Sequence, residues 1–538
     1  MSDILPTPAG DRPEQTHPAG AVPRPAAPSE PMGVEGAILD PEAPSARDPW
    51  VNGEVLPGAP VPSGDRPRGR GVTALVAAGV AVVLVGGAAV AWAAFNGDTG
   101  DQPEKHLPAT AAAMIEVDLD PSGSQKIDAI RFFRKFPFAS DLREDSDPRR
   151  FLYEKLTAQD ASAPAWSEVE PWLGSRVGLA ALPGGRDGAP VPVAVLQVTD
   201  EARATATLAK AADDDMAFAV ADGWATISDT RAHVDAATRS AAGGSLADDA
   251  SFRKDVDALG DAGVVTGWAD PSRLPALGEA LQPGSLLGLR GGMTSGVLGG
   301  GDLLKQRYAA VARFTGGNAE VVVRTFGSTG ASTAAGAGAA VSALPEDTVA
   351  AVGVSGAGDT IRTAAAGSGQ AVQGSLDEFG QQTGLKLPED LQALLGRRAA
   401  VALAEPDGSG RPVLGVRAES DAAGLSGALD RLLRFTDASG FPLERRDVPG
   451  GYVLATDRTE AEAMTKDGGL GGTDAFRDAV PDADRASAVA YVDVERLLAT
   501  YAKGMDDMTA ALRPLRAVGL SVTATGDGTT TTVRVTTR

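Results

Sequence analysis

The chain has no cysteine among its 538 residues. This absence excludes disulfide bridges, thiolate-bound zinc, thiol catalysis and lipid attachment through an N-terminal cysteine. Histidine is nearly absent, because only His17, His106 and His233 occur. Only His233 falls in a segment expected to fold, so a Ser-His-Asp triad or a histidine-rich metal centre would have to use it. Its setting, TRAHVDAATRSA, instead predicts a partly exposed histidine on the polar face of a helix.

Basic and aromatic side chains are also scarce. The chain has 49 lysines and arginines against 71 aspartates and glutamates, a formal net charge of -22, and aromatic residues make up 5%. A protein this acidic repels nucleic-acid phosphates, and no dense basic stripe offsets that repulsion. We therefore expect no nucleic-acid partner.

The chain begins with a proline-rich segment. Residues 1–70 show no sustained apolar period and cannot bury enough apolar surface to fold alone. They predict a disordered cytoplasmic tail, or alternatively a segment that presents polyproline-like turns to a partner. The arginines of RPRGRG are spaced, so the twin-arginine pattern of a Tat signal is absent.

Residues 72–95, VTALVAAGVAVVLVGGAAVAWAAF, are apolar throughout. They can cross a bilayer core of about 30 Å, so residues 71–95 are predicted to form a single transmembrane helix held by the lipid bilayer. Three arginines precede this segment and three acidic residues follow it: Arg66, Arg68, Arg70, Asp98, Asp101 and Glu104. The positive-inside rule then places the N-terminus in the cytoplasm and the C-terminal region outside the cell membrane. A cleavable signal peptide is the alternative, but the long preceding tail favours an uncleaved anchor.

After the apolar segment, the same order of phrases runs twice along the chain. DASFRKDV begins at Asp249, and TDAFRDAV begins at Thr473. WLGSRVGLAAL is matched later by LLGRRAAVALA, PVPVAVLQVTD by RPVLGVRAESD, and DGWATISDT by GGYVLATDR. Each pass closes in an apparent hairpin, with Gly-Gly-Asn in the first turn and Gly-Asp-Gly in the second.

This repetition predicts an α+β fold class. The tail and the transmembrane helix should be followed by two homologous α+β domains with mostly antiparallel sheets and packed helices. The first domain is expected to span residues 107–326 and the second residues 340–538. Linkers at 96–106 and 327–339 are expected to separate the first domain from the anchor and from the second domain.

The phrase that opens at Asp249 and Thr473 has a structural explanation. An aspartate or threonine at a helix start caps free backbone N–H groups, and a phenylalanine one turn later, Phe252 or Phe476, enters the core. The arginine that follows each phenylalanine is expected to face outward. We therefore interpret the repeated phrase as a capped helix with one large core residue.

Two further pairs of aspartates follow predicted strands. Asp200 and Asp421 are expected to cap the next helices. Asp270 and Asp493 stand in GWADPSRL and AYVDVERL, where an apolar strand leads into a helix. Because the repeat contains both, Asp270 and Asp493 are the candidate ligand-site residues, although a helix cap explains an aspartate there on structural grounds alone.

A proline-rich tail, a single anchor and a duplicated outer region with helix-start AFR phrases and strand-end aspartates resemble a family of actinobacterial membrane proteins of unknown function. The resemblance covers most of residues 103–538. It implies a membrane-anchored protein with a duplicated extracytoplasmic α+β domain, and it supplies no catalytic residues.

No segment identifies a chemical activity. GVSGAGDTI lacks the spacing of a dinucleotide fingerprint or a P-loop, and ADDDMA and GMDDMTA lack the alternating ligands of a calcium loop. We therefore expect no cofactor, no metal and a non-catalytic single-pass protein of the cell envelope whose outer region binds a ligand, lipid or protein partner. The alternatives are a carboxylate-dependent envelope hydrolase and a transmembrane sensor that signals through its proline-rich tail. The oligomeric state stays open.

Overall fold

The computed structural model describes residues 101–119, 123–137, 147–157, 163–212, 216–274, 305–327, 334–359, 361, 370–502 and 506–538. The predicted tail (1–70), the predicted transmembrane helix (71–95) and residues 96–100 lie outside these stretches. None of the helices within them is long and apolar enough to cross a membrane.

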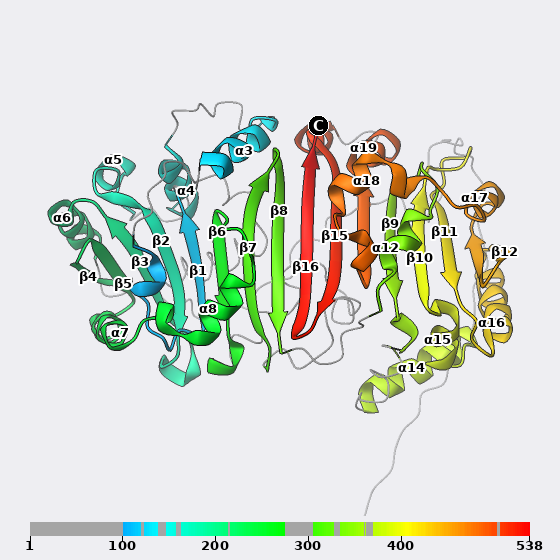
Figure 1. Cartoon of the computed structure of the whole chain (residues 1–538), viewed down its shortest axis with the longest axis horizontal. Coiled ribbons are helices and arrows are strands. Elements are labelled where there is room, and N and C mark those ends of the chain that lie inside the picture. Colours follow the sequence, from blue (N-terminus) through cyan, green and yellow to red (C-terminus); the bar gives the residue numbers. More distant parts are fainter. Residues whose placement is uncertain are drawn as a thin grey trace, which may run out of the picture. The chain divides into compact units, whose positions relative to one another are not determined.

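The described residues are organised around one sheet of sixteen strands (Figure 1). The N-terminal half contributes β1 (Ala113–Asp118), β2 (Leu173–Leu182), β3 (Val191–Val198), β4 (Ala217–Ala221), β5 (Trp224–Ser228), β6 (Val265–Ala269), β7 (Arg307–Thr315) and β8 (Asn318–Phe326). The C-terminal half contributes β9 (Ala350–Ser355), β10 (Arg398–Ala404), β11 (Val413–Glu419), β12 (Glu444–Val448), β13 (Gly451–Ala455), β14 (Ala488–Asp493), β15 (Leu515–Thr525) and β16 (Gly528–Thr537). Every pairing is antiparallel.

Helices pack on both faces of this sheet, which confirms the predicted α+β class. Those of the N-terminal half are α3 (Gly123–Phe133), α4 (Pro148–Thr157), α5 (Trp166–Val169), α6 (Glu201–Ala211), α7 (Arg231–Gly243) and α8 (Ala250–Asp257), with short 3₁₀ helices η1 (Pro103–Lys105), η4 (Leu246–Asp248) and η5 (Pro271–Arg273). Those of the C-terminal half are α12 (Ala337–Ser342), α14 (Gln370–Thr383), α15 (Glu389–Leu395), α16 (Leu425–Ala438), α17 (Arg458–Ala463), α18 (Asp474–Ala479), α19 (Val494–Tyr501) and α20 (Asp506–Leu512).

The strand order is the same in both halves. The sheet runs β12-β13-β11-β10-β9-β14-β15-β16-β8-β7-β6-β1-β2-β3-β5-β4. From the central β8–β16 pair outward, the N-terminal half runs β8-β7-β6-β1-β2-β3-β5-β4. The C-terminal half runs β16-β15-β14-β9-β10-β11-β13-β12, which is the same order. The central register places Gly528 opposite Phe326 and Val535 opposite Ala319. The two halves therefore share one continuous sheet.

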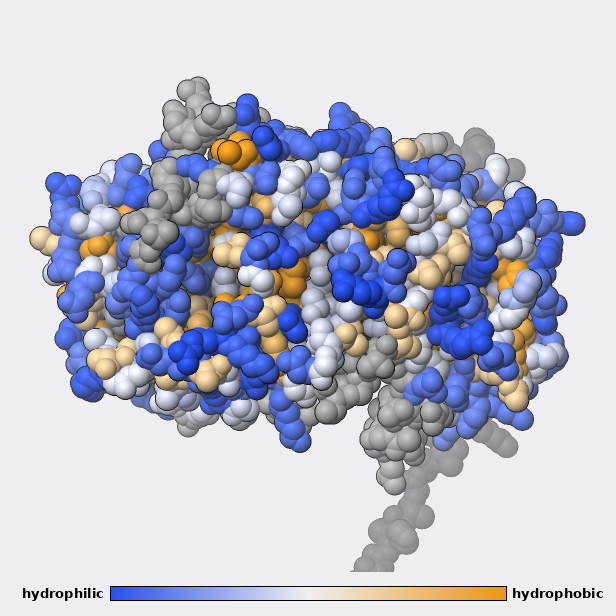
Figure 2. Space-filling view, viewed as in Figure 1, coloured by the Kyte–Doolittle hydropathy of each residue, from blue (hydrophilic) through white to orange (hydrophobic). Residues whose placement is uncertain are grey.

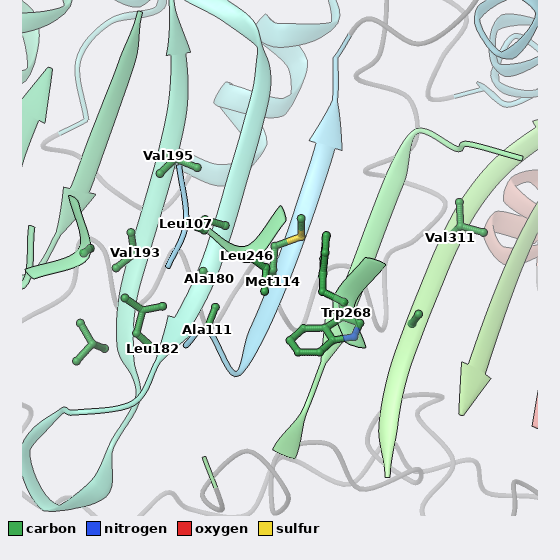
Figure 3. Close-up of a cluster of buried hydrophobic side chains, with 14 of the residues drawn as sticks. Leu107, Ala111, Met114, Ala180, Leu182, Val193, Val195, Leu246, Trp268 and Val311 are labelled. Atoms are coloured by element: carbon green, nitrogen blue, oxygen red, sulfur yellow. The ribbon is translucent and has the colours of Figure 1, made fainter. Parts of the chain in front are cut away.

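Alternate side chains of β1 enter two different cores, because a strand directs successive residues to opposite faces. Met114 packs with Leu107, Leu246 and Trp268 on the face that carries α8 (Figure 3). Ile115 packs with phenylalanines of α3 on the opposite face. In Figure 1, α8, α12 and α18 lie in front of the sheet, and the same face in Figure 2 is mostly hydrophilic, with hydrophobic residues in small groups.

The repeated phrase forms the predicted capped helices. The Asp249 carboxylate accepts the Phe252 N–H at 2.8 Å at the start of α8. The Thr473 hydroxyl accepts the Phe476 N–H at 3.3 Å at the start of α18. Both phenylalanines are buried, and the arginine after each is exposed. The interpretation as a cap followed by a core anchor is confirmed.

The two other predicted caps behave differently from each other. Asp200 caps α6, because its carboxylate accepts the Arg203 N–H at 3.0 Å. The same prediction for Asp421 is wrong. The chain continues past Asp421 to Gly424, whose φ of 99° starts α16, and the Asp421 carboxylate instead pairs with Arg397 at 2.6 Å. A glycine at the cap provides the left-handed backbone that other residues rarely adopt.

Both predicted linkers contain residues that belong to the fold. Residues 101–106 lie in the predicted linker 96–106, yet η1 packs against β2 and β3 and buries Pro103. Ala337 lies in the predicted linker 327–339, yet it begins α12 and is fully buried in the core beneath α18. The small, polar and proline residues of both predicted linkers therefore gave no indication that parts of these segments pack against the sheet.

Candidate functional site

Asp270, one of the two predicted site residues, follows β6 and caps η5. Its backbone N–H donates to the Ala112 carbonyl at 2.7 Å. Its Oδ1 accepts the Ser272 N–H at 3.1 Å, and Arg273 Nε donates to its Oδ2 at 3.1 Å. The residue is 9% exposed. Both carboxylate oxygens are therefore occupied inside the protein.

Arg273 extends this arrangement into a structural tie. Its guanidinium binds the Asp249 carboxylate at 2.8 Å and the carbonyls of Ala109 and Ala111 at 2.7 and 3.0 Å. It also lies 4.8 Å from the ring centre of Trp268, within cation–π range. The group joins the end of β6, the cap of α8 and the segment that enters β1.

Asp493 occupies the matching place in the C-terminal half. Its N–H donates to the Val349 carbonyl at 2.8 Å, as that of Asp270 does to Ala112. Its carboxylate caps α19 by accepting the Arg496 N–H at 2.8 Å, and Arg496 Nε lies 3.5 Å from Oδ2. An arginine three residues after the aspartate is thus common to both positions.

The two aspartates do not form one site. The strands β7, β8, β16 and β15 lie between β6 and β14, so the sheet spacing separates Asp270 from Asp493 by roughly 24 Å. The two carboxyl groups of a glycosidase lie only about 5 to 9.5 Å apart. Asp270 and Asp493 therefore serve as two separate helix caps.

A buried ion pair near Trp268 has no signal in the sequence, because Asp255 stands among the polar residues of a short helix. Asp255 is 0% exposed, and Arg307 donates to its carboxylate from Nε at 2.7 Å and from Nη2 at 3.0 Å. Trp268 Nε1 donates to the same group at 3.1 Å. The caps and the strand register place Ala479 and Ala517 at the corresponding positions of the second half.

His233 lies in the first turn of α7 and is partly exposed, as predicted. Its Nδ1 is 2.5 Å from Asp229 Oδ1. The Ser228 hydroxyl is 3.1 Å from the same oxygen, but Ser228 is 0% exposed and donates to the Pro192 carbonyl at 2.7 Å. A substrate cannot reach this hydroxyl, so the group is a structural hydrogen-bond chain.

A continuous row of apolar side chains crosses the sheet on the face that α3 covers. Paired residues on neighbouring strands point to the same face, so the register identifies the members of the row. From β13 to β5 they are Leu454, Val416, Val401, Val352, Ala490, Leu520, Val533, Val321, Ala312, Val265, Val117, Val177, Leu196 and Ala225. We call this set the apolar row.

The apolar row is covered in the N-terminal half and open in part of the C-terminal half. Under α3, Phe132, Phe133, Phe136 and Phe314 form an aromatic cluster over β1, β6 and β7. Ile115, beside the row, is consequently 8% exposed. Its counterpart Val352 is 50% exposed, and the adjacent Val401 is 45% exposed.

Leu414 on β11 shares this face, because it pairs with Leu403 and Leu403 pairs with Ala350. It is 47% exposed. Elsewhere in this half, helix α14 packs against α16, and its Phe379 is 50% exposed. Val352, Val401 and Leu414 therefore form what we call the open apolar surface, on three adjacent strands.

Within the described stretches, no group of three or more histidine, aspartate and glutamate residues is arranged to hold a metal ion. No family model, curated protein or solved structure matches the chain. The open apolar surface is thus the candidate functional site. It follows from the tertiary structure, because the sequence patterns point only to Asp270 and Asp493.

Proposed function

We propose that this chain is a non-catalytic, single-pass membrane protein whose extracytoplasmic region binds the acyl chains of membrane lipids at the open apolar surface. The observation that carries the proposal is the exposure of Val352, Val401 and Leu414 on three adjacent strands. Burying a valine or leucine side chain fully contributes about 1.5–3 kcal/mol, and about half of each of these side chains is still exposed, so an apolar occupant gains on the order of 1 kcal/mol per residue.

The predicted transmembrane helix indicates which apolar ligand lies near the protein. The predicted transmembrane helix ends at Phe95, and the described fold begins at Asp101. The intervening residues 96–100 reach at most about 17 Å when fully extended. The fold would therefore stay close to the outer leaflet, where lipid acyl chains are the most abundant apolar groups.

The charge of the protein favours acyl chains over headgroups as the recognised part of the lipid. The formal net charge is -22, and a surface of anionic headgroups repels such a protein. The three residues of the open apolar surface carry no charge with which to hold a headgroup. We therefore expect the open apolar surface to contact the acyl chains of lipids and not their headgroups.

We also infer that the two halves are homologous α+β domains. Their identical strand order, the paired caps Asp249 and Thr473, and the paired aspartates Asp270 and Asp493 support this inference. The resemblance to a duplicated actinobacterial membrane family belongs to the same proposal. In this view the first domain retains the phenylalanine cover of α3, while the second offers the corresponding sheet face to a ligand.

The proposal can be tested by photocrosslinking of the full chain in nanodiscs that contain phosphatidylcholine with a diazirine-bearing acyl chain. After illumination, mass spectrometry should find adducts on the peptides that contain Val352, Val401 and Leu414. The double substitution Val352→Asp and Val401→Asp should abolish these adducts, because a charge opposes burial of hydrocarbon.

A matched control is Ala236→Asp, which adds the same charge at an exposed position of α7. It should leave the adducts unchanged. Circular dichroism melts would verify that all variants remain folded. Absence of adducts on the β9–β11 peptides, or adducts that persist in the double variant, would contradict lipid binding at this surface.

A further inference from the structure

The first described residues, Asp101 to His106, cross the sheet as a short segment that we call the N-terminal strap. Its Pro103 packs over Gly178 of β2, where an added Cβ would lie only 2.6 Å from the proline Cβ. The His106 ring stacks on Trp224 with ring centres 4.4 Å apart, and its Nε2 lies 2.8 Å from Asp101 Oδ2. The strap therefore rests on a fitted surface of β2 and β5.

Beneath the strap, the guanidinium of Arg176 lies close to several carboxyl groups. Arg176 of β2 is 6% exposed. Its Nη1 is 3.0 Å from Gln102 Oε1 on the strap, 2.9 Å from Asp118 Oδ2 and 3.5 Å from Glu116 Oε1 on β1. Glu104 of η1 is close enough to Arg176 for the guanidinium to lower its pKa, and its Oε2 is buried without a hydrogen-bond partner among the described residues.

The net charge of this cluster depends on how many of its carboxyl groups are protonated. Glu104, Glu116 and Asp118 together carry three negative charges when ionised, against the single positive charge of Arg176. Burial raises the pKa of Glu116 to about 8, with a further contribution from the charges of Glu104 and Asp118. Burial also raises the pKa of Glu104.

Two further charged groups near the cluster belong to the strap itself. Lys105 and Asp101 lie beside Glu104, where the lysine lowers and the aspartate raises its pKa. On the far side of Glu116, β6 places the uncharged Thr266 opposite it. Lys105 also pairs with Asp101 at 2.6 Å, so its charge is shared with that carboxylate.

We propose that the N-terminal strap is a proton-dependent latch, closed while the Glu104 and Glu116 carboxyls are protonated and released as they ionise. Ionisation of both adds two negative charges to a largely buried group that already contains Asp118, and lifting the strap exposes these charges to water. Release ends at Leu107, which is fully buried and accepts the Leu246 N–H at 2.8 Å.

The direction of the pH effect follows from linkage. The closed state holds protons more tightly than the open state, so opening becomes more favourable as pH rises from the ordinary glutamate value toward 8. If one proton is coupled, the opening equilibrium increases about tenfold for each pH unit in that range and levels off above it. A released strap of six residues lengthens the tether to the predicted anchor by up to about 20 Å.

Hydrogen exchange of the full chain in detergent micelles, followed by mass spectrometry, tests the latch. The reporters are the Lys105 and His106 amides, which donate to the carbonyls of Gln102 and Pro103 in the strap. After correction for intrinsic exchange rates, their protection should fall steeply between pH 5.5 and pH 7.5. The double variant Glu104→Gln, Glu116→Gln should keep the protection of the low-pH state throughout.

The matched control is Glu170→Gln, an exposed glutamate of the same half, which should retain the steep pH dependence. Peptides from β2 and β3 report in the same experiment whether each variant keeps its sheet. Strap protection that is independent of pH in the unmodified chain would refute the latch. The same conclusion would follow if the double variant lost protection with pH as steeply as the unmodified chain.

Discussion

The buried pair of Asp255 and Arg307 allows a stringent test of the packing in the N-terminal half. The carboxylate of Asp255 is fully buried and accepts three hydrogen bonds, two from Arg307 and one from Trp268. Asp255→Ala leaves the indole N–H without its acceptor and the guanidinium without its counter-charge. We expect it to lower the free energy of unfolding by about 3–5 kcal/mol.

The reverse substitution, Arg307→Ala, leaves a buried carboxylate without its cation and should cost a similar amount. The double variant should cost less than the sum of the two, with a coupling energy of about 2–3 kcal/mol. Ala479 and Ala517 already occupy the corresponding positions of the second half and are buried there. That half shows how the same strand and helix pack without the charges.

Denaturant unfolding of the full chain in detergent, followed by tryptophan fluorescence, measures these free energies. A useful control is Glu462→Ala, which removes an exposed i,i+4 partner of Arg458 and should leave the free energy of unfolding nearly unchanged. Single variants that lie within about 1 kcal/mol of the unmodified chain, or costs that simply add, would refute the argument.

Two further predictions concern other carboxyl groups. Burial raises the pKa of Glu460 to about 7, so the free energy of unfolding of the unmodified protein should fall as pH rises from about 4.5 to 7. In calorimetric melts at pH 8, Glu460→Gln should be more stable than the unmodified protein by up to about 3 kcal/mol. Equal pH trends in both proteins would contradict this. Asp270→Ala should lower the free energy of unfolding by about 2–3 kcal/mol, because Arg273 loses its carboxylate partner. Asp493→Ala should lower it by about 1 kcal/mol, the usual cost of losing a helix cap. Equal costs in denaturant unfolding would show that the contacts of Arg273 add no stability.

Local features of the fold were predictable where neighbouring residues decide them. The caps at Asp249 and Thr473, the core positions of Phe252 and Phe476, and the partial exposure of His233 depend on a few consecutive residues. Asp421 shows the limit of this reasoning. Its three-residue distance from the start of α16 is a property of the loop, and the Arg397 that binds it is distant in the sequence.

The α+β class, the repeated order of strands and helices, and most helix caps can be read from the sequence, because hydrophobic period and capping chemistry act over short distances. Three features depend on contacts between distant segments: the single sheet that joins both halves through β8 and β16, the separation of Asp270 from Asp493, and the part of the apolar row that is covered. Ile115 and Val352 hold corresponding apolar positions on the first strand of each half, yet only Val352 is exposed. The exposure of Val352 and Val401 depends on where a separate helix packs, and that is a property of the assembled chain.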